Sequence, residues 1–438
     1  MRNILCCLLL MAGVVLSSCQ KDHETAAVKG LVITSIWPAS GIPATIVTIN
    51  GKNFSGVREN NTVKFNGVQA IVIEASATQL QVVSPANGTS GNVTVTVNSQ
   101  EAVGPSFAYT APPEEYMVST FAGEGTSGSV EGSFAMARFK NPEGITIDAQ
   151  GNFIVTDRGN NRIRKLGTNG MVSAIAGKDA GGFKDGDASV ALFKLPWRAA
   201  VDAQGNMYVA DRDNHRIRKI TPAGVVSTFA GTGTAGFEDG PAATAKFNQP
   251  IDITLDPAGN LYVADNLNHR IRKIATDGSV STVAGDGTAG FADGTGTAAK
   301  LRNPSGIDMD KDGNLVVADR TNHRIRMIAP DGVVTTIAGD GVSGYKDGAA
   351  AAARFADPYG ITVDHAGNII VADLSNNKIR KITAEGIVST VAGTSNGFAN
   401  GAGGGAQFSQ PTDVCVDADD NIYVADLGNH RIRKISLK

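Results

Sequence analysis

Side chains that could perform chemistry recur at a fixed spacing along most of the chain, in the pattern Asp-x-x-Asn-His-Arg or a close variant of it. Carboxylate and imidazole groups serve as general acids, general bases and metal ligands, so this pattern is the first candidate for an active site. Its aspartate occurs six times, at Asp157, Asp211, Asp265, Asp319, Asp373 and Asp426. Successive copies are 54, 54, 54, 54 and 53 residues apart, and such a period is typical of an array built from one supersecondary unit. Positions that are identical in every unit have equivalent surroundings, which favours a structural role for them.

Each group in the pattern is therefore assigned a role inside its own repeat. We expect the aspartate to accept hydrogen bonds from backbone N–H groups of the loop that follows it. One basic position is expected to pair with these carboxylates or to lie along an apolar wall: Arg162, Arg216, Arg270, Arg324, Lys378 and Arg431. Another position holds His215, His269, His323 and His430, with Asn161 and Asn377 in the other two repeats. Equivalent loops of a radial array lie on a wide circle, so we expect a hydrogen bond in each turn and no shared metal ion.

The spacing within one repeat predicts four short β-strands, which fall at 250–256, 261–265, 270–274 and 279–285 in the third repeat. Four-stranded units repeated radially are typical of a β-propeller. The fourth-strand sequence also occurs at 117–123, before the first aspartate strand, while the chain stops at Lys438, just after the last third strand. We therefore predict an all-β propeller of six blades in which residues 117–123 complete the sixth blade and close the ring.

The copies disagree most in the two residues that follow the proline of each first strand, and we expect these residues to line the mouth of the central channel. They are Glu143-Gly144, Trp197-Arg198, Ile251-Asp252, Ser305-Gly306, Tyr359-Gly360 and Thr412-Asp413. Aromatic faces and a few polar groups in a concavity are typical of a ligand site. The predicted ligand-binding residues are Glu143, Trp197, Arg198, Asp252, Tyr359 and Asp413, with Trp197 and Tyr359 as stacking platforms for a sugar. The competing interpretation is unselected drift at exposed positions.

The repeats resemble the NHL family of six-bladed propellers over residues 117–438. The resemblance depends on Gly-Asn-x-Tyr-Val-Ala-Asp-x-x-Asn-His-Arg-Ile, which is almost unaltered at 205–217, 259–271 and 420–432. Related six-bladed propellers include lactonases, lyases and amidating lyases that use a divalent metal in the channel. Under that alternative, Glu143, Asp252 and Asp413 would supply oxygen ligands for Ca²⁺ or Mg²⁺. The mouth lacks the histidine ligands that such enzymes often show, so we expect no cofactor and no catalysis.

Residues 30–110 are predicted to form a separate small β-sandwich, because strand-like runs at 46–49, 62–65 and 93–97 alternate with tight turns. This segment resembles the IPT/TIG family of immunoglobulin-like domains, which usually serve as spacers or binding modules, at 36–41, 47–54 and 63–67. Trp37 lies next to a proline, and we expect it to pack against the domain and not to stack on a sugar. The tandem prolines of residues 111–116 predict a short stiff linker.

The N-terminus is predicted to direct export. Residues 4–16 are nearly all apolar, a run too short to span a bilayer, and they suit a signal peptide over 1–18. The sequence Leu-Ser-Ser-Cys that ends at Cys19 resembles the lipobox of bacterial lipoproteins, which implies lipidation of Cys19 and a tether over 19–29. An ordinary secretory signal is the alternative. The next residues, Gln-Lys-Asp-His-Glu, resemble sorting signals of surface-exposed outer-membrane lipoproteins.

Composition limits the classes of function. The net charge of −3 over 438 residues gives no electrostatic case for binding nucleic acid. Cys415 stands alone in a strand-like run and is expected to be a small buried residue. The order of tether, spacer and propeller resembles surface glycan-binding lipoproteins of polysaccharide uptake systems. We therefore expect a non-catalytic, surface-exposed outer-membrane lipoprotein that binds a glycan or protein ligand at the propeller mouth and could join an outer-membrane transporter complex. The alternative is a metal-dependent hydrolase, lactonase or lyase with its site in the channel.

Overall fold

Two compact units make up the chain, and each is described by itself. A computed structural model describes residues 30–110 and 114–438. Strands dominate both units, and the described residues contain short 3₁₀ turns but no α-helix, which confirms the all-β prediction. Within these residues no helix is long and apolar enough to cross a bilayer. The predicted signal peptide 1–18, Cys19 with its tether 19–29, and residues 111–113 of the linker lie outside the described residues.

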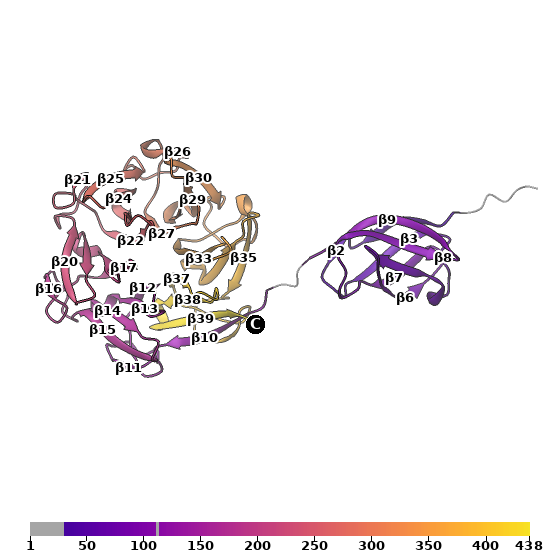
Figure 1. Ribbon diagram of the computed structural model, residues 1–438, viewed down its shortest axis with the longest axis horizontal. Helices are drawn as coiled ribbons and strands as arrows, with labels where there is room; N and C mark the ends of the chain where they lie inside the picture. Colours follow the sequence, from indigo (N-terminus) through magenta and orange to yellow (C-terminus); the bar gives the residue numbers. More distant parts are fainter. Residues whose placement is uncertain (1–29, 111–113) are drawn as a thin grey trace, which may run out of the picture. The chain divides into compact units, whose positions relative to one another are not determined.

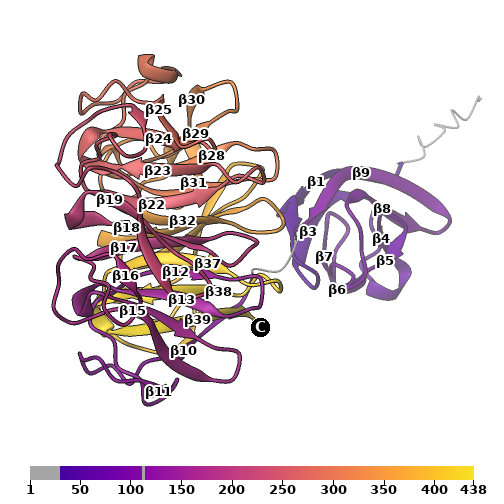
Figure 2. The ribbon, with the colours of Figure 1, turned by 60° about the vertical axis from the view of Figure 1, so that its left-hand side comes forward.

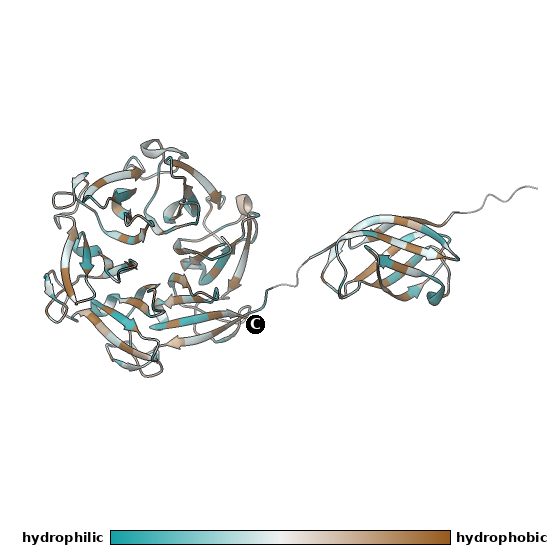
Figure 3. Cartoon of the chain, viewed as in Figure 1, coloured by the Kyte–Doolittle hydropathy of each residue, from teal (hydrophilic) through white to brown (hydrophobic). Residues whose placement is uncertain are grey.

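The N-terminal unit is a sandwich of two sheets (Figure 2). One sheet contains, in spatial order, β1 (Val32–Trp37), β3 (Ile46–Lys52), β7 (Gln79–Val83) and β6 (Ile71–Ala75). The other contains β2 (Ser40–Gly41), β9 (Gln100–Tyr109), β8 (Gly91–Val97), β4 (Thr62–Phe65) and β5 (Val68–Gln69), and η1 (Arg58–Asn60) precedes β4. Alternate residues of the strands point into a shared apolar core that includes Val47, Leu80, Val93 and Phe107. Colour by hydropathy shows the same alternation along the strands (Figure 3).

Trp37 does not pack in this core, contrary to the prediction. Its neighbour Ile36 is buried, and because side chains alternate along a strand, Trp37 faces outward, opposite Thr48 of β3. The Trp37 side chain is 74% exposed.

The C-terminal unit consists of six five-stranded sheets arranged around a centre (Figure 1). From the inner strand outward, the first repeat contains β12 (Pro142–Ile147), β13 (Phe153–Asp157), β14 (Arg162–Leu166), β15 (Met171–Gly177) and β11 (Gly132–Ser133). In the same order, the second contains β17 (Pro196–Val201), β18 (Met207–Asp211), β19 (Arg216–Ile220), β20 (Val225–Ala230) and β16 (Gly186–Asp187). The third contains β22 (Pro250–Leu255), β23 (Leu261–Asp265), β24 (Arg270–Ile274), β25 (Ser279–Ala284) and β21 (Gly240–Pro241).

The fourth repeat follows the same order, with β27 (Pro304–Met309), β28 (Leu315–Asp319), β29 (Arg324–Ile328), β30 (Val333–Ala338) and β26 (Gly294–Thr295). The fifth contains β32 (Pro358–Val363), β33 (Ile369–Asp373), β34 (Lys378–Ile382), β35 (Ile387–Ala392) and β31 (Gly348–Ala349). A 3₁₀ turn follows the second strand of every repeat: η2 (Arg158–Asn160), η3 (Arg212–Asn214), η4 (Asn266–Asn268), η6 (Arg320–Asn322), η8 (Leu374–Asn376) and η9 (Leu427–Asn429). The fifth, two-residue strand was not predicted. It belongs to the long connection between repeats, which also contains η5 (Gly296–Ala298) and η7 (Ala350–Ala352).

The sixth sheet combines both ends of this unit. It contains β37 (Pro411–Val416), β38 (Ile422–Asp426), β39 (Arg431–Leu437), β10 (Tyr116–Ala122) and β36 (Gly401–Ala402). Strand β10 is antiparallel to β39, with Tyr116 opposite Leu437 and Met117 opposite Ser436. The N-terminal strand thus supplies the fourth strand that the last repeat lacks, as the count of strand sequences predicted. Each inner strand also contacts the inner strand of the next repeat, and β12 contacts β37.

A buried ion pair braces every repeat. In the second repeat, Asp211 Oδ2 accepts hydrogen bonds from Arg218 Nη1 at 2.8 Å and from Asn214 Nδ2 at 2.8 Å, and Oδ1 accepts one from the backbone N–H of Lys194 at 2.8 Å. Arg218 also donates to the carbonyl oxygens of Leu192 and Lys184. The equivalent pairs are Asp157–Arg164, Asp265–Arg272, Asp319–Arg326, Asp373–Arg380 and Asp426–Arg433.

Two details of the predicted brace are wrong. The partner of the aspartate is the second arginine of Arg-Ile-Arg, while the first arginine donates to backbone carbonyls, as Arg216 does to Asn214 and Thr232. The backbone N–H group that the aspartate accepts also belongs to the preceding connection and not to the following loop.

The histidine position joins neighbouring repeats. His215 ends η3 in the left-handed conformation, with φ of 53°, and its Nδ1 accepts a hydrogen bond from the backbone N–H of Gln249 in the next repeat at 3.1 Å. His269, His323 and His430 make the same contact, and Asn161 and Asn377 make it through Oδ1. The predicted hydrogen bond exists, but it links two repeats and not one turn. Burial lowers the pKa of all four histidines, which favours the neutral form that accepts through Nδ1.

These contacts predict a pH dependence of stability. The folded-state pKa of each linking histidine lies below its ordinary value of 6.5, so the unfolded chain binds more protons and the free energy of unfolding falls as pH falls below about 6.5. Replacing all four histidines with Asn, the residue that two repeats already use, is expected to weaken this acid sensitivity. Urea unfolding at several pH values between 7.5 and 5 measures how the free energy of unfolding changes with pH. His365→Asn, which changes an exposed histidine paired with Asp420, is the control and should not weaken it. Equal acid sensitivity in the quadruple variant and the parent would contradict the prediction.

Candidate functional site

The channel residues that differ between repeats are all buried. The structure gives Glu143, Trp197, Arg198, Asp252, Tyr359 and Asp413 less than a tenth of their surface exposed. They lie at the start of the inner strands β12, β17, β22, β32 and β37, where the chain enters the channel. The structure thus places the predicted residues in one region of the channel, and their burial argues against the competing interpretation of drift at exposed positions.

Arg198 lies across the channel and holds two carboxylates of other repeats. Its Nη1 donates to Asp252 Oδ2 at 2.7 Å, and its Nε lies 3.3 Å from Asp413 Oδ1. Each aspartate also accepts a backbone N–H, Asp252 from Ile307 at 2.9 Å and Asp413 from Ile145 at 2.8 Å. Burial raises the pKa of Asp413 and of Asp252, and the charge of Arg198 acts in the opposite direction. Arg198, Asp252 and Asp413 form a group that we call the Arg198 triad. Within it, the guanidinium charge of Arg198 favours the ionised form of the two buried aspartates.

Glycines in the remaining repeats make room for these side chains. A Cβ on Gly144 would lie 2.8 Å from Arg198 Cγ, and one on Gly360 would lie 2.6 Å from Asp413 Cα. Both distances are shorter than ordinary van der Waals contact. At the second residue after the proline of the inner strand, three repeats thus contribute a charged side chain and the other three contribute glycine.

Two aromatic rings meet across the channel. Trp197 Nε1 donates a hydrogen bond to the hydroxyl of Tyr359 at 2.7 Å, although the two residues belong to the second and fifth repeats. The guanidinium groups of Arg158 and Arg212 lie 4.7 and 4.2 Å from the Trp197 ring centroid. Those of Arg198 and Arg320 lie 5.1 and 4.9 Å from that of Tyr359. Guanidinium groups thus occupy the ring faces that were predicted to stack on a sugar, and this role is corrected.

Glu143 is a buried carboxylate with incomplete hydrogen bonding. It is 1% exposed, and its Oε2 lies 3.0 Å from Arg158 Nη1. Among the described residues no donor is well aligned on either oxygen, although the Tyr359 hydroxyl lies close enough to lower the pKa of Glu143. Burial raises its pKa, while Arg158 and Arg198 act in the opposite direction. Buried polar groups are normally hydrogen-bonded, so this carboxylate is a candidate for contact with a ligand.

A cavity of about 270 Å³ opens at this end of the channel. It is lined by Glu143, Arg158, Trp197, Arg320, Tyr359, Leu374, Gln410, Thr412 and Leu427. We call it the mouth cavity. It combines one buried carboxylate and two guanidinium groups with aromatic, amide and apolar side chains, a set that can orient a small polar ligand.

Besides Gln410, the sequence prediction missed four of these lining residues, which share one position in the repeat: Arg158, Arg320, Leu374 and Leu427. Each directly follows the aspartate of the brace, and the equivalent residues of the other repeats are Arg212 and Asn266. The same signal that located Glu143, disagreement between aligned copies, was present at this position. It was overlooked because the position lies inside the most regular stretch of the repeat.

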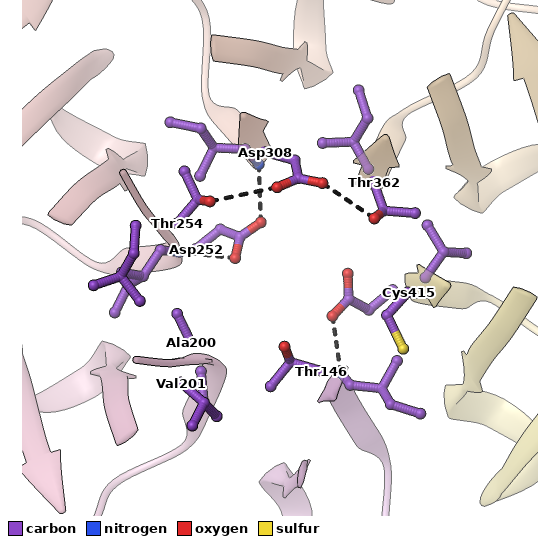
Figure 4. A pocket seen from close by; sticks show the side chains of 16 residues that line it. Thr146, Ala200, Val201, Asp252, Thr254, Asp308, Thr362 and Cys415 are labelled. Carbon is purple, nitrogen blue, oxygen red and sulfur yellow. Dashed lines mark hydrogen bonds between the residues drawn. The ribbon is translucent and has the colours of Figure 1, made fainter. Parts of the chain in front are cut away.

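A second cavity, of about 220 Å³, is lined by residues of the inner strands (Figure 4). Asp252, Asp308 and Asp413 line it, together with Thr146, Thr254 and Thr362. The carboxylate of Asp308 accepts hydrogen bonds from Thr362 Oγ1 at 3.1 Å and Thr254 Oγ1 at 3.4 Å, and Cys415 is buried beside them as expected. All three carboxylates are thus held by protein donors.

The carboxylates proposed for Ca²⁺ or Mg²⁺ are not brought together. Arg198 lies between Asp252 and Asp413, and Glu143 pairs with Arg158 instead. Within residues 30–110 and 114–438, no three His, Cys, Asp or Glu side chains are close enough to hold a metal ion. The metal-dependent alternative stays a prediction that this side-chain arrangement does not favour.

Comparison with known families agrees with this geometry. Residues 31–111 match the IPT/TIG domain, and five segments match the NHL repeat: 139–166, 193–220, 247–274, 301–326 and 408–435. The chain is an IPT/TIG domain followed by NHL repeats. NHL repeat-containing protein 2 of Bos taurus is 30% identical over 68% of this chain and 46% of its own length. Protein SUPPRESSOR OF QUENCHING 1 of Arabidopsis thaliana is 30% identical over 59% of this chain and 26% of its own length. The chain therefore spans less than half the length of these two relatives.

Solved structures share the fold over nearly the whole chain. An auxiliary nutrient binding protein from Bacteroides ovatus has a TM-score of 0.58 at 19% identity, covering 94% of this chain and 98% of its own. One from Bacteroides thetaiotaomicron has a TM-score of 0.57 at 18% identity, covering 93% of this chain and 98% of its own. At identities of this size, the similarity is one of fold.

The Arg198 triad yields a stability prediction for the NHL propeller. Arg198→Met leaves Asp252 and Asp413 buried without their counter-charge, and is expected to lower the free energy of unfolding by about 3–5 kcal/mol. Adding Asp252→Asn and Asp413→Asn should recover much of the loss, because amide oxygens can still accept the N–H groups of Ile307 and Ile145. Urea unfolding followed by Trp fluorescence measures both variants. A triple variant no more stable than Arg198→Met would contradict the assigned role.

Proposed function

We propose that this protein is a non-catalytic binding module whose ligand site is the mouth cavity. The observation that carries the proposal is the Glu143 carboxylate, which is buried at the cavity, pairs with Arg158, and has no well-aligned hydrogen bond from the described residues. Around it, the propeller replaces repeated residues with side chains that occur in one or a few repeats only. Leaving a buried polar group unpaired costs about 1–3 kcal/mol, and a ligand that donates hydrogen bonds to it would recover that loss.

The ligand is a small polar unit, either free or part of a larger glycan or protein. The mouth cavity, at about 270 Å³, lies just below the size range of about 300–1,000 Å³ that is usual for whole drug-sized ligands. A protein partner would normally cover about 800 Å² of surface, mostly outside such a cavity. A polar cavity of a size that admits one unit of a chain therefore favours a glycan over a folded protein.

We also propose that Cys19 is lipidated and holds the protein at the outer surface of the outer membrane. The Leu-Ser-Ser-Cys sequence and the sorting residues after it support this. Two solved neighbours of similar fold are described as auxiliary nutrient binding proteins from Bacteroides species, which is compatible with a role beside an outer-membrane transporter complex.

The glycan proposal predicts that blocking the mouth cavity abolishes binding. A panel of neutral and acidic oligosaccharides is titrated into the purified protein by isothermal calorimetry, and at least one is expected to bind. Leu374→Trp adds bulk at the mouth cavity and should weaken that binding at least about tenfold. Val225→Thr changes an exposed residue of the outer strand β20 and should leave it unchanged. Absence of binding across the panel, or full binding by Leu374→Trp, would refute the proposal.

Lipidation of Cys19 is tested by fractionation. The parent protein should sediment with membranes and enter the detergent phase of a Triton X-114 separation, since lipid chains supply the membrane affinity. Cys19→Ser should stay in the aqueous phase, and Ser18→Ala, which keeps a small residue before the cysteine, should behave like the parent. Equal partitioning of Cys19→Ser and the parent would rule out a lipid anchor at this residue.

A further inference from the structure

Positive charge is concentrated on one set of repeats around the mouth cavity. The residue after the brace aspartate is arginine in the first, second and fourth repeats (Arg158, Arg212 and Arg320), and Asn266, Leu374 and Leu427 in the others. Two of the three arginines, Arg158 and Arg320, line the cavity itself. A cavity with two guanidinium groups favours a ligand that carries a negative charge.

The aromatic rings hold these guanidinium groups in place. Arg158 lies on Trp197 and Arg320 lies on Tyr359, and the two rings are joined by the hydrogen bond between Trp197 Nε1 and the Tyr359 hydroxyl. A guanidinium that packs on an aromatic face keeps its N–H groups available and has less freedom to lose on binding. The cavity therefore presents two positioned donors of a kind that suits a planar carboxylate.

The arginines differ in how well the protein already satisfies them. Arg212 donates to Asp213 at 2.9 Å and to Gln249 at 2.6 Å. Arg320 has its nearest carboxylate, Asp357, at 3.7 Å, which is beyond hydrogen-bonding distance, and its side chain is 35% exposed. Within residues 30–110 and 114–438, the polar partner of Arg158 is Glu143, at 3.0 Å, and the Arg158 side chain is 25% exposed. Arg320 and Arg158 are thus the two arginines with capacity for a ligand.

Glu143 adds a second requirement. Its oxygens accept no well-aligned hydrogen bond from the part of the chain that the structure describes. A ligand that only brought a negative charge would draw Arg158 away and leave this carboxylate buried beside another anion. A neutral sugar would satisfy Glu143 but leave the guanidinium groups unpaired. A ligand that meets both needs carries a carboxylate and neighbouring hydroxyl groups.

We propose that the mouth cavity binds a uronic acid unit of an acidic glycan, with its carboxylate on Arg320 and Arg158 and its hydroxyl groups donating hydrogen bonds to Glu143. The proposal rests on the binding function proposed above and names the ligand class of the same site. Arg158 changes partner on binding, from Glu143 to the ligand carboxylate. This exchange exposes the Glu143 oxygens to the sugar hydroxyls, so the buried carboxylate gains hydrogen bonds at the moment when it loses its counter-charge.

The test compares ligands that differ only in charge. Short oligosaccharides of galacturonate, glucuronate and mannuronate are titrated into the unaltered protein, alongside their methyl esters and a sulfated galactan oligosaccharide. At least one uronate is expected to bind about tenfold or more tightly than its ester, and this preference should shrink as salt is raised. No variant is needed for this comparison, so a folding defect cannot obscure it.

Matched variants then assign the charge preference to residues. Arg320→Gln and Arg158→Gln should each remove most of the preference for acid over ester. Arg212→Gln is the control, because this arginine also packs on Trp197 but does not line the cavity, and it should retain the preference. Thermal melting of each variant confirms that it is folded.

The outcomes separate this inference from the function on which it rests. Equal affinity for uronates and their esters, preference for the sulfated sugar, or unchanged preference in Arg320→Gln would overturn the uronate assignment. If a neutral sugar binds and Leu374→Trp blocks it, the binding function stands while the assignment fails. If no sugar of either panel binds, both fail.

Discussion

The buried pair between aspartate and arginine is the interaction on which the propeller depends. Each aspartate oxygen is occupied, one by a backbone N–H of the incoming connection and the other by the arginine and an asparagine of the same repeat. Burial raises the pKa of Asp211 to about 6, and that of Asp265 to about the same value, against the effect of these donors. In a medium of low polarity such a group is tolerated only when its hydrogen bonds are complete. The strand, the turn and the connection must therefore meet in one geometry, which explains why six copies of this stretch have scarcely changed.

This constraint leaves limited space for variation. Residues that complete the brace cannot differ between repeats without leaving a charge unpaired, whereas the start of the inner strand and the residue after the aspartate contribute nothing to it. Those two positions supply Arg198, Asp252 and Asp413 inside the channel and Arg158 and Arg320 at its mouth. The brace can therefore be the same in every repeat while the channel residues differ, because the two sets use different side chains of the repeat.

The sequence predicted the fold far better than the contacts of the site. A period of 54 residues, with one strand sequence displaced to residues 117–123, was enough to place β10 beside β39, because strand count alone decides that pairing. It also showed that Glu143, Trp197 and Arg198 belong near one channel. The partners of Arg198 could not be foreseen, since contacts between the second, third and sixth repeats depend on how far each side chain reaches across the channel. Burial of Trp197 beneath two arginines was hidden for the same reason, and Arg320 was overlooked because it lies inside the repeated pattern.

The pairing of β10 with β39 also orders the events of folding. Lys438 and Glu115, which form an ion pair at one end of the β10–β39 pairing, are 323 residues apart in the chain. Contacts of such long sequence separation form late, because the entropy of a very large loop must be overcome first. The first propeller strand to be synthesised must therefore wait for the last one, and five repeats can assemble before it finds its partner. Until then β10 is an unpaired strand with its hydrogen-bonding groups free, the kind of edge through which incompletely folded chains associate with one another.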